Sequence, residues 1–337
     1  VGEKSPRALR IAAAHTDFPG FRVKPAASEK KDGYGCLNVE PYGGLILSSW
    51  LDRPLSLAGE VVLRGKDPFH PEPYLIDLAR PLLTIPRLAI HLNREVNEHG
   101  EKLDRQTALT PLAALLAEEE GDDFFLRKLA REIGHQPEDI LSYDLTVYAA
   151  ESGCTMGFDG ELLSAPRLDN LAGVCACLDA LIDSTSEKGI QLVALFDHEE
   201  VGSRTKQGAA SALLPDLLSA VYRGLELDAD DLLADIAGGF LLSVDAAHAL
   251  HPNYPDKSDP TNRPRLGKGL VIKQAAGQSY VGDATAAAIV QGLCEANDIP
   301  WQTFANRSSI PGGSTLGAIA SAHIGIRGQD VGVPLLA

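Results

Sequence analysis

Short apolar runs that end abruptly in polar side chains recur near the start of this chain and through its second half. Buried strands are predicted at residues 10–14, 190–196 and 239–244, which have the length and composition of such strands. Helices are predicted at residues 172–182 and 283–297, which are longer segments whose apolar residues have helical spacing. This alternation of strands and helices predicts an α/β fold.

The middle of the chain, residues 47–148, is more polar and carries many prolines. Strands are predicted there at residues 55–64, as an edge strand with a glycine, and at 141–150, and helices at 109–119 and 123–132. We interpret this region as an inserted domain whose role is contact with another chain rather than chemistry. The predicted domains are therefore a catalytic domain in two parts, 1–46 and 149–337, and an insertion at 47–148.

Bulk properties narrow the class of protein. The 337 residues exceed the usual size of a single core. A net charge of −16 argues against nucleic acid or an anionic membrane as a partner. Five cysteines, an odd count without a CxxC, predict reduced thiols and a cytoplasmic location. The sequence begins at Val1 and stops at Ala337 inside an apolar run, so we expect the native protein to extend beyond both of these residues.

The strongest chemical signal is the acidic run that follows the strand at 190–196. It reads Asp197, His198, Glu199 and Glu200. A buried, unpaired carboxylate costs several kcal/mol or takes up a proton, and adjacent like charges add to this conflict. A divalent metal would remove it, with one glutamate as ligand and its neighbour as the acceptor of a proton from water. A solvated loop with an acidic tip is the alternative, and this stretch alone does not decide between them.

Other ionisable residues fall at similar places. His15 follows the strand at 10–14, Asp245 follows the strand at 239–244, and Asp169 opens the helix that contains 172–182. Ligands of open α/β sheets bind beyond the carboxyl ends of the strands, so these side chains are expected to meet. Nitrogen and oxygen donors suit zinc, cobalt or manganese, and a carboxylate that bridges two ions would give a two-metal hydrolytic site.

Each residue has a structural alternative. His15 could be a satisfied histidine at a strand end, Asp169 a helix N-cap, and Asp245 a loop carboxylate. If all of these alternatives held, several polar residues would end up beside one another for unrelated reasons. One metal site explains all of them, so we favour it. The Gly312–Thr315 run could present backbone N–H groups to a carboxylate or an oxyanion, although a plain tight turn explains it equally well. A G-x-S-x-G elbow and a Walker loop are both absent from the sequence.

Several longer motifs carry a resemblance to a known family. They are AHTD at 14–17, LAIHLNR at 88–94, RLDNL at 167–171, DHEEVGS at 197–203, SVDAAHALHPNY at 243–254, GSTLG at 313–317 and the segment 325–333. In this order they span almost the whole chain, which resembles the aspartyl aminopeptidase family of dinuclear zinc exopeptidases. The resemblance implies a mixed-sheet catalytic domain covered by helices, with an inserted, mostly-β dimerisation domain.

The resemblance also implies the roles of the site residues. Two Zn²⁺ ions, with Co²⁺ or Mn²⁺ as alternatives, would be held by His15, Asp169, Glu200 and Asp245, with Asp169 as the bridge. Glu199 would be the general base that deprotonates the bridging water. His91 would reach into a neighbouring subunit's site and stabilise the oxyanion there. The substrate-binding candidates are Gly313, Ser314 and Lys273.

The implied activity is removal of the N-terminal residue of peptides, with Asp or Glu as the preferred residue, by subunits that assemble as dimers in a dodecamer. The family's last zinc-binding histidine follows the final strand, and we expect it beyond Ala337. Three alternatives remain open: a Leu-type aminopeptidase of the same family, a di-metal deacylase of N-acyl amino acids, and a catalytically silent homologue with an assembly role.

Overall fold

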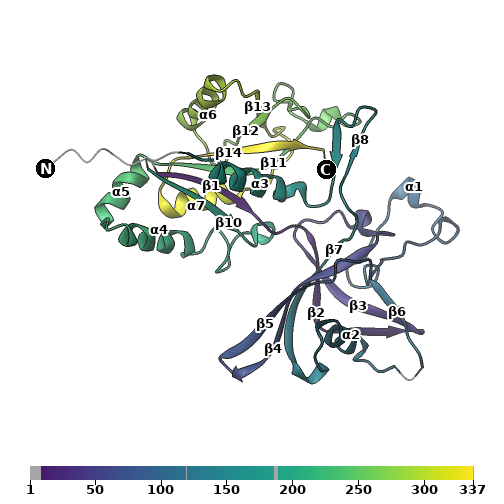
Figure 1. The fold of residues 1–337 in the computed structure, drawn as a ribbon. Coiled ribbons are helices and arrows are strands. Elements are labelled where there is room, and N and C mark those ends of the chain that lie inside the picture. The colour runs from purple at the N-terminus through teal and green to yellow at the C-terminus, as the bar shows by residue number, and fades with distance from the viewer. Residues whose placement is uncertain (1–8, 119, 186–188, 337) are drawn as a thin grey trace. The chain divides into compact units, whose positions relative to one another are not determined.

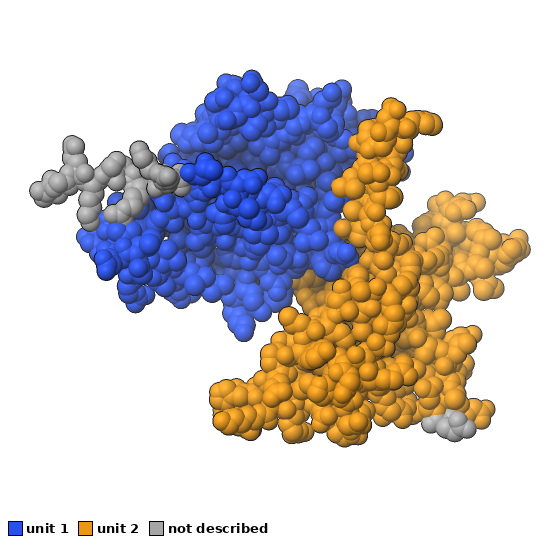
Figure 2. All heavy atoms as spheres, viewed as in Figure 1, with its two compact units in different colours: residues 1–18, 167–337 blue, residues 19–166 orange. Residues whose placement is uncertain are grey.

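The computed structural model describes residues 9–118, 120–185 and 189–336 and divides into two compact units. Unit 1 comprises Val1–Phe18 and Arg167–Ala337, and unit 2 comprises Pro19–Pro166, as Figure 2 shows in blue and orange. These boundaries differ from those predicted at 46/47 and 148/149. The strands that follow Phe18 pair within the sheet of unit 2, so they belong to the insertion.

Unit 1 is built on a six-stranded mixed sheet with the order β10-β1-β11-β14-β12-β13 (Figure 1). Its strands are β1 (Leu9–His15), β10 (Ile190–Phe196), β11 (Phe240–His248), β12 (Leu270–Gln274), β13 (Trp301–Ala305) and β14 (Gly328–Leu335). The first four strands of this order are parallel to one another, whereas β12 is antiparallel to β14 and parallel to β13. The predicted mixed α/β architecture is confirmed.

Helices cover both faces of this sheet. They are α3 (Leu168–Ile182), α4 (Leu213–Gly224), α5 (Ala229–Ala237), α6 (Ala284–Ala296) and α7 (Leu316–Ile324). Alternation along β1 sends Ile11 into a core with α4, α5 and α7, and Ala14 into a second core with α3 and α6. Because helices cover both faces, most residues of these strands are apolar, and the polar exceptions include Ser243 and Asp245 within β11.

Unit 2 is mostly β, as predicted. Its six-stranded sheet is antiparallel, with the order β5-β4-β7-β2-β3-β6. The strands are β2 (Gly20–Lys31), β3 (Tyr34–Tyr42), β4 (Leu55–Asp67), β5 (His70–Asp77), β6 (Leu112–Leu115) and β7 (Ile140–Ala149). The helix α2 (Phe124–Ile133) packs on this sheet through Phe124 and Leu129. The smaller elements are α1 (Val96–His99) and the hairpin of β8 (Cys154–Met156) and β9 (Leu162–Ser164).

Two predictions in this region were wrong. The segment predicted as a helix at 109–119 contains the strand β6, because pairing with β3 overrides a local sequence that would also suit a helix. The predicted edge strand at 55–64 lies inside the sheet, between β5 and β7. Gly59 permits this position, since a Cβ atom there would lie 2.1 Å from the carbonyl oxygen of Asp144 on β7.

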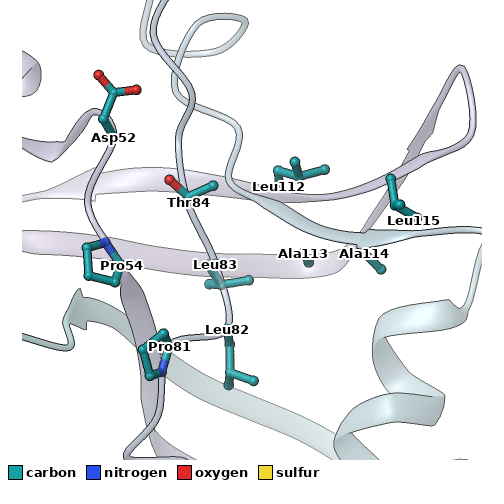
Figure 3. A pocket seen from close by; sticks show the side chains of 10 residues that line it. All are labelled: Asp52, Pro54, Pro81, Leu82, Leu83, Thr84, Leu112, Ala113, Ala114 and Leu115. Atoms are coloured by element: carbon teal, nitrogen blue, oxygen red, sulfur yellow. The ribbon is translucent and has the colours of Figure 1, made fainter.

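A groove of about 550 Å³ lies beside β6 (Figure 3). Its lining is mostly apolar, with Asp52 as the charged member: Asp52, Pro54, Pro81, Leu82, Leu83, Thr84, Leu112, Ala113, Ala114 and Leu115. None of these residues is a predicted site residue, and the predicted metal ligands all lie in unit 1. In the part of the chain that the structure describes, no helix has the length and apolar character needed to cross a membrane.

Candidate metal centre

The sheet of unit 1 brings the predicted ligands from distant parts of the sequence to one place. His15, the last residue of β1, is level with Phe196, the last residue of β10. Its Nε2 atom lies 3.3 Å from Oδ1 of Asp169 in the first turn of α3, and 3.5 Å from Oδ1 of Asp245 on β11. His15 is only 2 % exposed, whereas the Asp169 side chain is 49 % exposed. The cluster is therefore anchored inside the sheet and open on one side.

The two glutamates complete the cluster. Glu199 and Glu200 lie on η4 (Glu199–Val201), a single turn that begins after His198, whose φ of 60° lets the chain bend sharply away from β10. Donor atoms of His15, Glu199 and Glu200 lie within 4.8 Å of one another, as do those of His15, Asp169 and Asp245. The structure thus brings together one imidazole and four carboxylates.

Asp17 is a residue of this centre to which the sequence analysis gave no role. The Nδ1 atom of His15 lies 3.0 Å from the backbone oxygen of Asp17 and 3.3 Å from its Oδ1. The carboxylate of Asp17 also accepts hydrogen bonds of 3.1 Å from the backbone N–H groups of both Glu199 and Glu200. Asp17 therefore sets the ring orientation of His15 and fixes the acidic turn beside it. The only signal in the sequence is its place two residues after His15.

Lys273 approaches the centre from β12. Its Nζ atom donates to Oδ2 of Asp245 over 3.0 Å and to the backbone oxygen of Ala246 over 2.7 Å, and its side chain is 3 % exposed. Asp245 itself lies on β11. The residue before it, Val244, accepts a hydrogen bond of 2.8 Å at its backbone oxygen from Nδ2 of Asn170, which attaches the start of α3 to β11. The position of Asp245 is therefore fixed from two neighbouring elements.

The electrostatics of the cluster favour a central positive charge. Burial alone lowers the pKa of His15, but hydrogen bonds to Asp169, Asp17 and Asp245 outweigh it and raise that pKa to about 12. Burial would raise the pKa of Asp245, but His15 and Lys273 hold it well below its usual range. The three aspartates thus stabilise a cation between them, here a proton on His15, and the nitrogen and oxygen donors of the cluster suit Zn²⁺.

The pKa values of the two glutamates shift in the opposite direction from that of Asp245. Burial raises the pKa of Glu199 to about 7 and that of Glu200 to about 8, and the neighbouring carboxylates add to both increases. Both groups therefore hold a proton easily near neutral pH, and a bound cation would favour their charged forms.

The remaining predicted residues lie elsewhere in the fold. Gly313 and Ser314 are exposed in the loop that leads into α7. His91 is exposed on η2 (Ile90–Leu92), a short turn of unit 2. The predicted role of His91 in a neighbouring subunit's site stays a prediction.

Comparison with known proteins decides the family. Residues 1–337 match the family described as "Aminopeptidase I zinc metalloprotease (M18)". The chain belongs to the M18 family. An M18 relative from Clostridium novyi (strain NT), named "Probable M18 family aminopeptidase 2", is 43 % identical over 338 residues, which cover all of this chain and 78 % of the relative.

Solved structures agree with this M18 assignment. One chain in the cryo-EM structure of the Ape4 and Nbr1 complex has a TM-score of 0.93 at 35 % identity, over 99 % of this chain and 67 % of that one. The Saccharomyces cerevisiae mApe1 dodecamer has a TM-score of 0.80 at 26 % identity, over 98 % and 74 % of the two chains. The predicted zinc-exopeptidase fold and the zinc-dependent aminopeptidase class are confirmed. The cluster around His15 offers nitrogen and oxygen donors of the kinds that suit zinc.

Proposed function

We propose that this M18 chain removes the N-terminal residue of peptides, with Asp or Glu preferred, at a centre that holds two zinc ions. The observation that carries this proposal is the pair of donor groups that share His15, one with Asp169 and Asp245 and the other with Glu199 and Glu200. We propose two ions rather than one because the carboxylate of Asp169 can bridge two metal ions, which leaves Glu199 as the base rather than a ligand.

The proposed roles follow from position and protonation. His15, Asp169, Glu200 and Asp245 hold the metal. Zinc, when bound there, supplies a Lewis acid that polarises the carbonyl group of the first peptide bond. Glu199 accepts a proton from the attacking water and returns it to the leaving amine. Its donor oxygen lies within 4.8 Å of the donor atoms of His15 and Glu200, which supports a role beside the metal.

The acidic preference is supported by Lys273. Its ammonium group is bonded to Asp245 and keeps a positive charge beside the centre, and we propose that this charge favours an acidic substrate side chain. Gly313 and Ser314, exposed ahead of α7, are proposed to bind the substrate through backbone N–H groups. A Lys273→Met variant is expected to lose activity on Asp and Glu substrates more than on Leu substrates.

We also propose that the protein works as an assembly of dimers in a dodecamer, with unit 2 as the dimerisation domain and His91 acting in a neighbour's site. The dodecameric relative and the exposed position of His91 support this arrangement. All five cysteines are free in the structure, which supports the proposal that the protein works in the cytoplasm.

One assay tests the proposed function. Chromogenic amides of Asp, Glu and Leu are offered to the protein after chelation and after addition of zinc, cobalt or manganese. Metal-dependent cleavage of Asp and Glu amides alone is the expected result. Cleavage of Leu amides would overturn the acidic preference. Metal-dependent cleavage of only N-acyl amino acids would favour a deacylase, and an intact oligomer inactive with every metal would favour a silent homologue.

A further inference from the structure

A second buried carboxylate lies outside the metal centre, in the segment 325–333 to which the proposed mechanism gives no role. Asp330 on β14 is fully buried. Its Oδ2 atom accepts hydrogen bonds from the backbone N–H of Val281 over 2.5 Å and from the hydroxyl of Thr315 over 2.7 Å. Its own N–H donates to the backbone oxygen of Val281 over 2.8 Å. One side chain therefore ties β14 to the loop before α6 and to the loop before α7.

Thr315 uses its hydroxyl in an unusual way. It occupies the N-cap position of α7, where a threonine side chain ordinarily accepts a hydrogen bond from the first turn of the helix, but it makes no such cap. Its hydroxyl donates to Asp330, and its backbone N–H donates to the backbone oxygen of Ser279 over 3.0 Å. The helix start thus gives up its side-chain cap while the two loops are joined to each other and to β14.

These loops are connected to the metal centre through Lys273. The ring of Tyr280 lies 5.1 Å from Nζ of Lys273, and that same atom bonds to the ligand Asp245. The backbone oxygen of Lys273 accepts a hydrogen bond of 2.8 Å from Nε2 of Gln329, the neighbour of Asp330. A single side chain therefore separates the loop of Tyr280 from a metal ligand.

The carboxyl group of Asp330 is not required by packing alone. Burial raises its pKa, and Lys273, Ser243 and Thr315 offset part of that rise. A buried acid carries a desolvation cost that an apolar residue at the same place would not carry. Its bonds to Thr315 and to the N–H of Val281 give this cost a structural purpose, which is to fix the two loops.

We propose that Asp330 is a positioning residue that holds the loops at 279–281 and 313–315 in register with Lys273, so that they orient the substrate. This inference rests on the proposed function, because it takes Gly313, Ser314 and Lys273 as substrate-binding residues. Asp330 bonds to none of the proposed metal ligands in the hydrogen bonds described above. Loss of its contacts is therefore expected to change substrate use and loop order, but to leave zinc binding unchanged.

The test removes one hydrogen bond without changing side-chain shape. In Thr315→Val, hydrogen exchange of the backbone at 277–282 is expected to become faster. The value of kcat/KM for an Asp amide is expected to fall by about tenfold, at the upper end of the usual effect of one lost hydrogen bond. Zinc content, measured per subunit, is expected to stay the same. Thr315→Ser keeps the hydroxyl and is expected to restore both values.

A matched control and a second variant complete the test. Thr303→Val removes a hydroxyl bond to Asn262 in the same unit and is expected to leave exchange at 277–282 unchanged. Asp330→Asn keeps an acceptor for Thr315 and Val281 and is expected to stay ordered, whereas Asp330→Ala is expected to loosen both loops.

Three outcomes would overturn the assignment. Unchanged exchange at 277–282 in Thr315→Val would show that the bond to Asp330 does not hold that loop. Faster exchange with an unchanged kcat/KM would show a structural contact without a role in substrate orientation. Equal losses in Thr315→Ser and Thr315→Val would exclude the hydroxyl as the cause. An inactive wild-type protein would instead contradict the proposed function, and the exchange measurements would still decide whether Asp330 holds the loops.

Discussion

Glu199 and Glu200 are neighbours in the chain, and both donate their backbone N–H groups to Asp17, yet we assign them different tasks. The change Glu199→Gln removes the proposed general base and keeps the size of the side chain. We expect kcat to fall by about 10²- to 10⁴-fold, which is the usual contribution of general base catalysis. Metal analysis of the purified variant is expected to show the zinc content of the wild type.

The comparison variant is Glu200→Gln, which removes a proposed ligand. We expect it to bind zinc more weakly and to regain part of its activity when zinc is added in excess. A Glu199→Gln variant that keeps most of its turnover would exclude this residue as the base, and one that loses its zinc would make it a ligand.

The pKa values of the cluster predict how the zinc-free protein responds to pH. The folded-state values of Glu199 and Glu200, about 7 and 8, stand above their ordinary value of 4.5, so the folded state binds protons more tightly than the unfolded state. The resulting stabilisation is complete below pH 4.5 and is lost as the pH rises through 7 and 8. His15, raised from 6.5 to about 12, acts in the same direction at higher pH.

We therefore expect the Tm of chelated protein to fall between pH 5 and pH 8, as measured by calorimetry. Zinc binding displaces these protons, so the increase in Tm produced by zinc is expected to grow over the same range. In Glu199→Gln one of the titrating groups is absent, and the decrease in the Tm of the chelated variant should be smaller. An equally steep decrease in that variant would contradict this explanation.

The limits of sequence reasoning are clear at Asp17. His15, Glu199, Glu200 and Asp245 follow apolar runs and Asp169 opens a helix, so the topology of a parallel sheet was enough to predict that they meet. The role of Asp17 rests on hydrogen bonds to residues 182 and 183 positions later in the chain. A local sequence pattern cannot predict a hydrogen bond between residues so far apart in the chain.

Gly59 shows how a single residue decides the place of a strand. It lies inside β4 with a φ of +150°, and a Cβ atom would lie 2.1 Å from the backbone oxygen of Asp144 on β7. We expect Gly59→Ala to lower the unfolding free energy of unit 2 by about 1–3 kcal/mol through overpacking. Denaturant unfolding followed with a probe in unit 2 measures this loss.

The control for Gly59→Ala is Gly44→Ala in the same unit, where an added Cβ would meet no atom within 4 Å. We expect its effect to stay within about 0.5 kcal/mol. Since both glycines belong to unit 2, zinc binding by unit 1 should be unchanged in either variant. A strong effect at Gly44 and none at Gly59 would show that contact with β7 is not the constraint.

At the scale of elements, the strands of unit 1 were predictable and β6 was not. Because both faces of β1, β10 and β11 are covered, most of their residues are apolar, and such runs can be recognised in the sequence without knowledge of the partner strands. The strand β6 has only four residues, Leu112–Leu115, and it exists because it pairs with β3. Its Leu- and Ala-rich sequence suits a helix equally well, so long-range pairing decided its structure.

The assembly as a whole can be tested through His91. We propose that His91 of one subunit serves the metal centre of another, so His91→Phe and Glu199→Gln would damage different halves of a shared site. Subunits of both kinds, produced together in one cell, should form some sites in which both residues are wild type. The activity of these mixed oligomers is expected to exceed the sum of the two pure variants. Purely additive activity would place both residues in the same subunit's site, or give His91 no role.

The split construction of unit 1 has a consequence for how the protein is made. The strand β1 lies between β10 and β11, yet all of unit 2 stands between β1 and both partners in the sequence. At roughly 5–20 residues per second, a ribosome needs roughly 7–30 s to synthesise unit 2 before it reaches β10. During that interval β1 has neither of its partner strands, so its apolar residues cannot yet pack in the sheet of unit 1. On a ribosome stalled just before Asp245, every residue of the unit 2 core has already been synthesised, so unit 2 can fold. The metal centre is still incomplete, because Asp245 is missing from it.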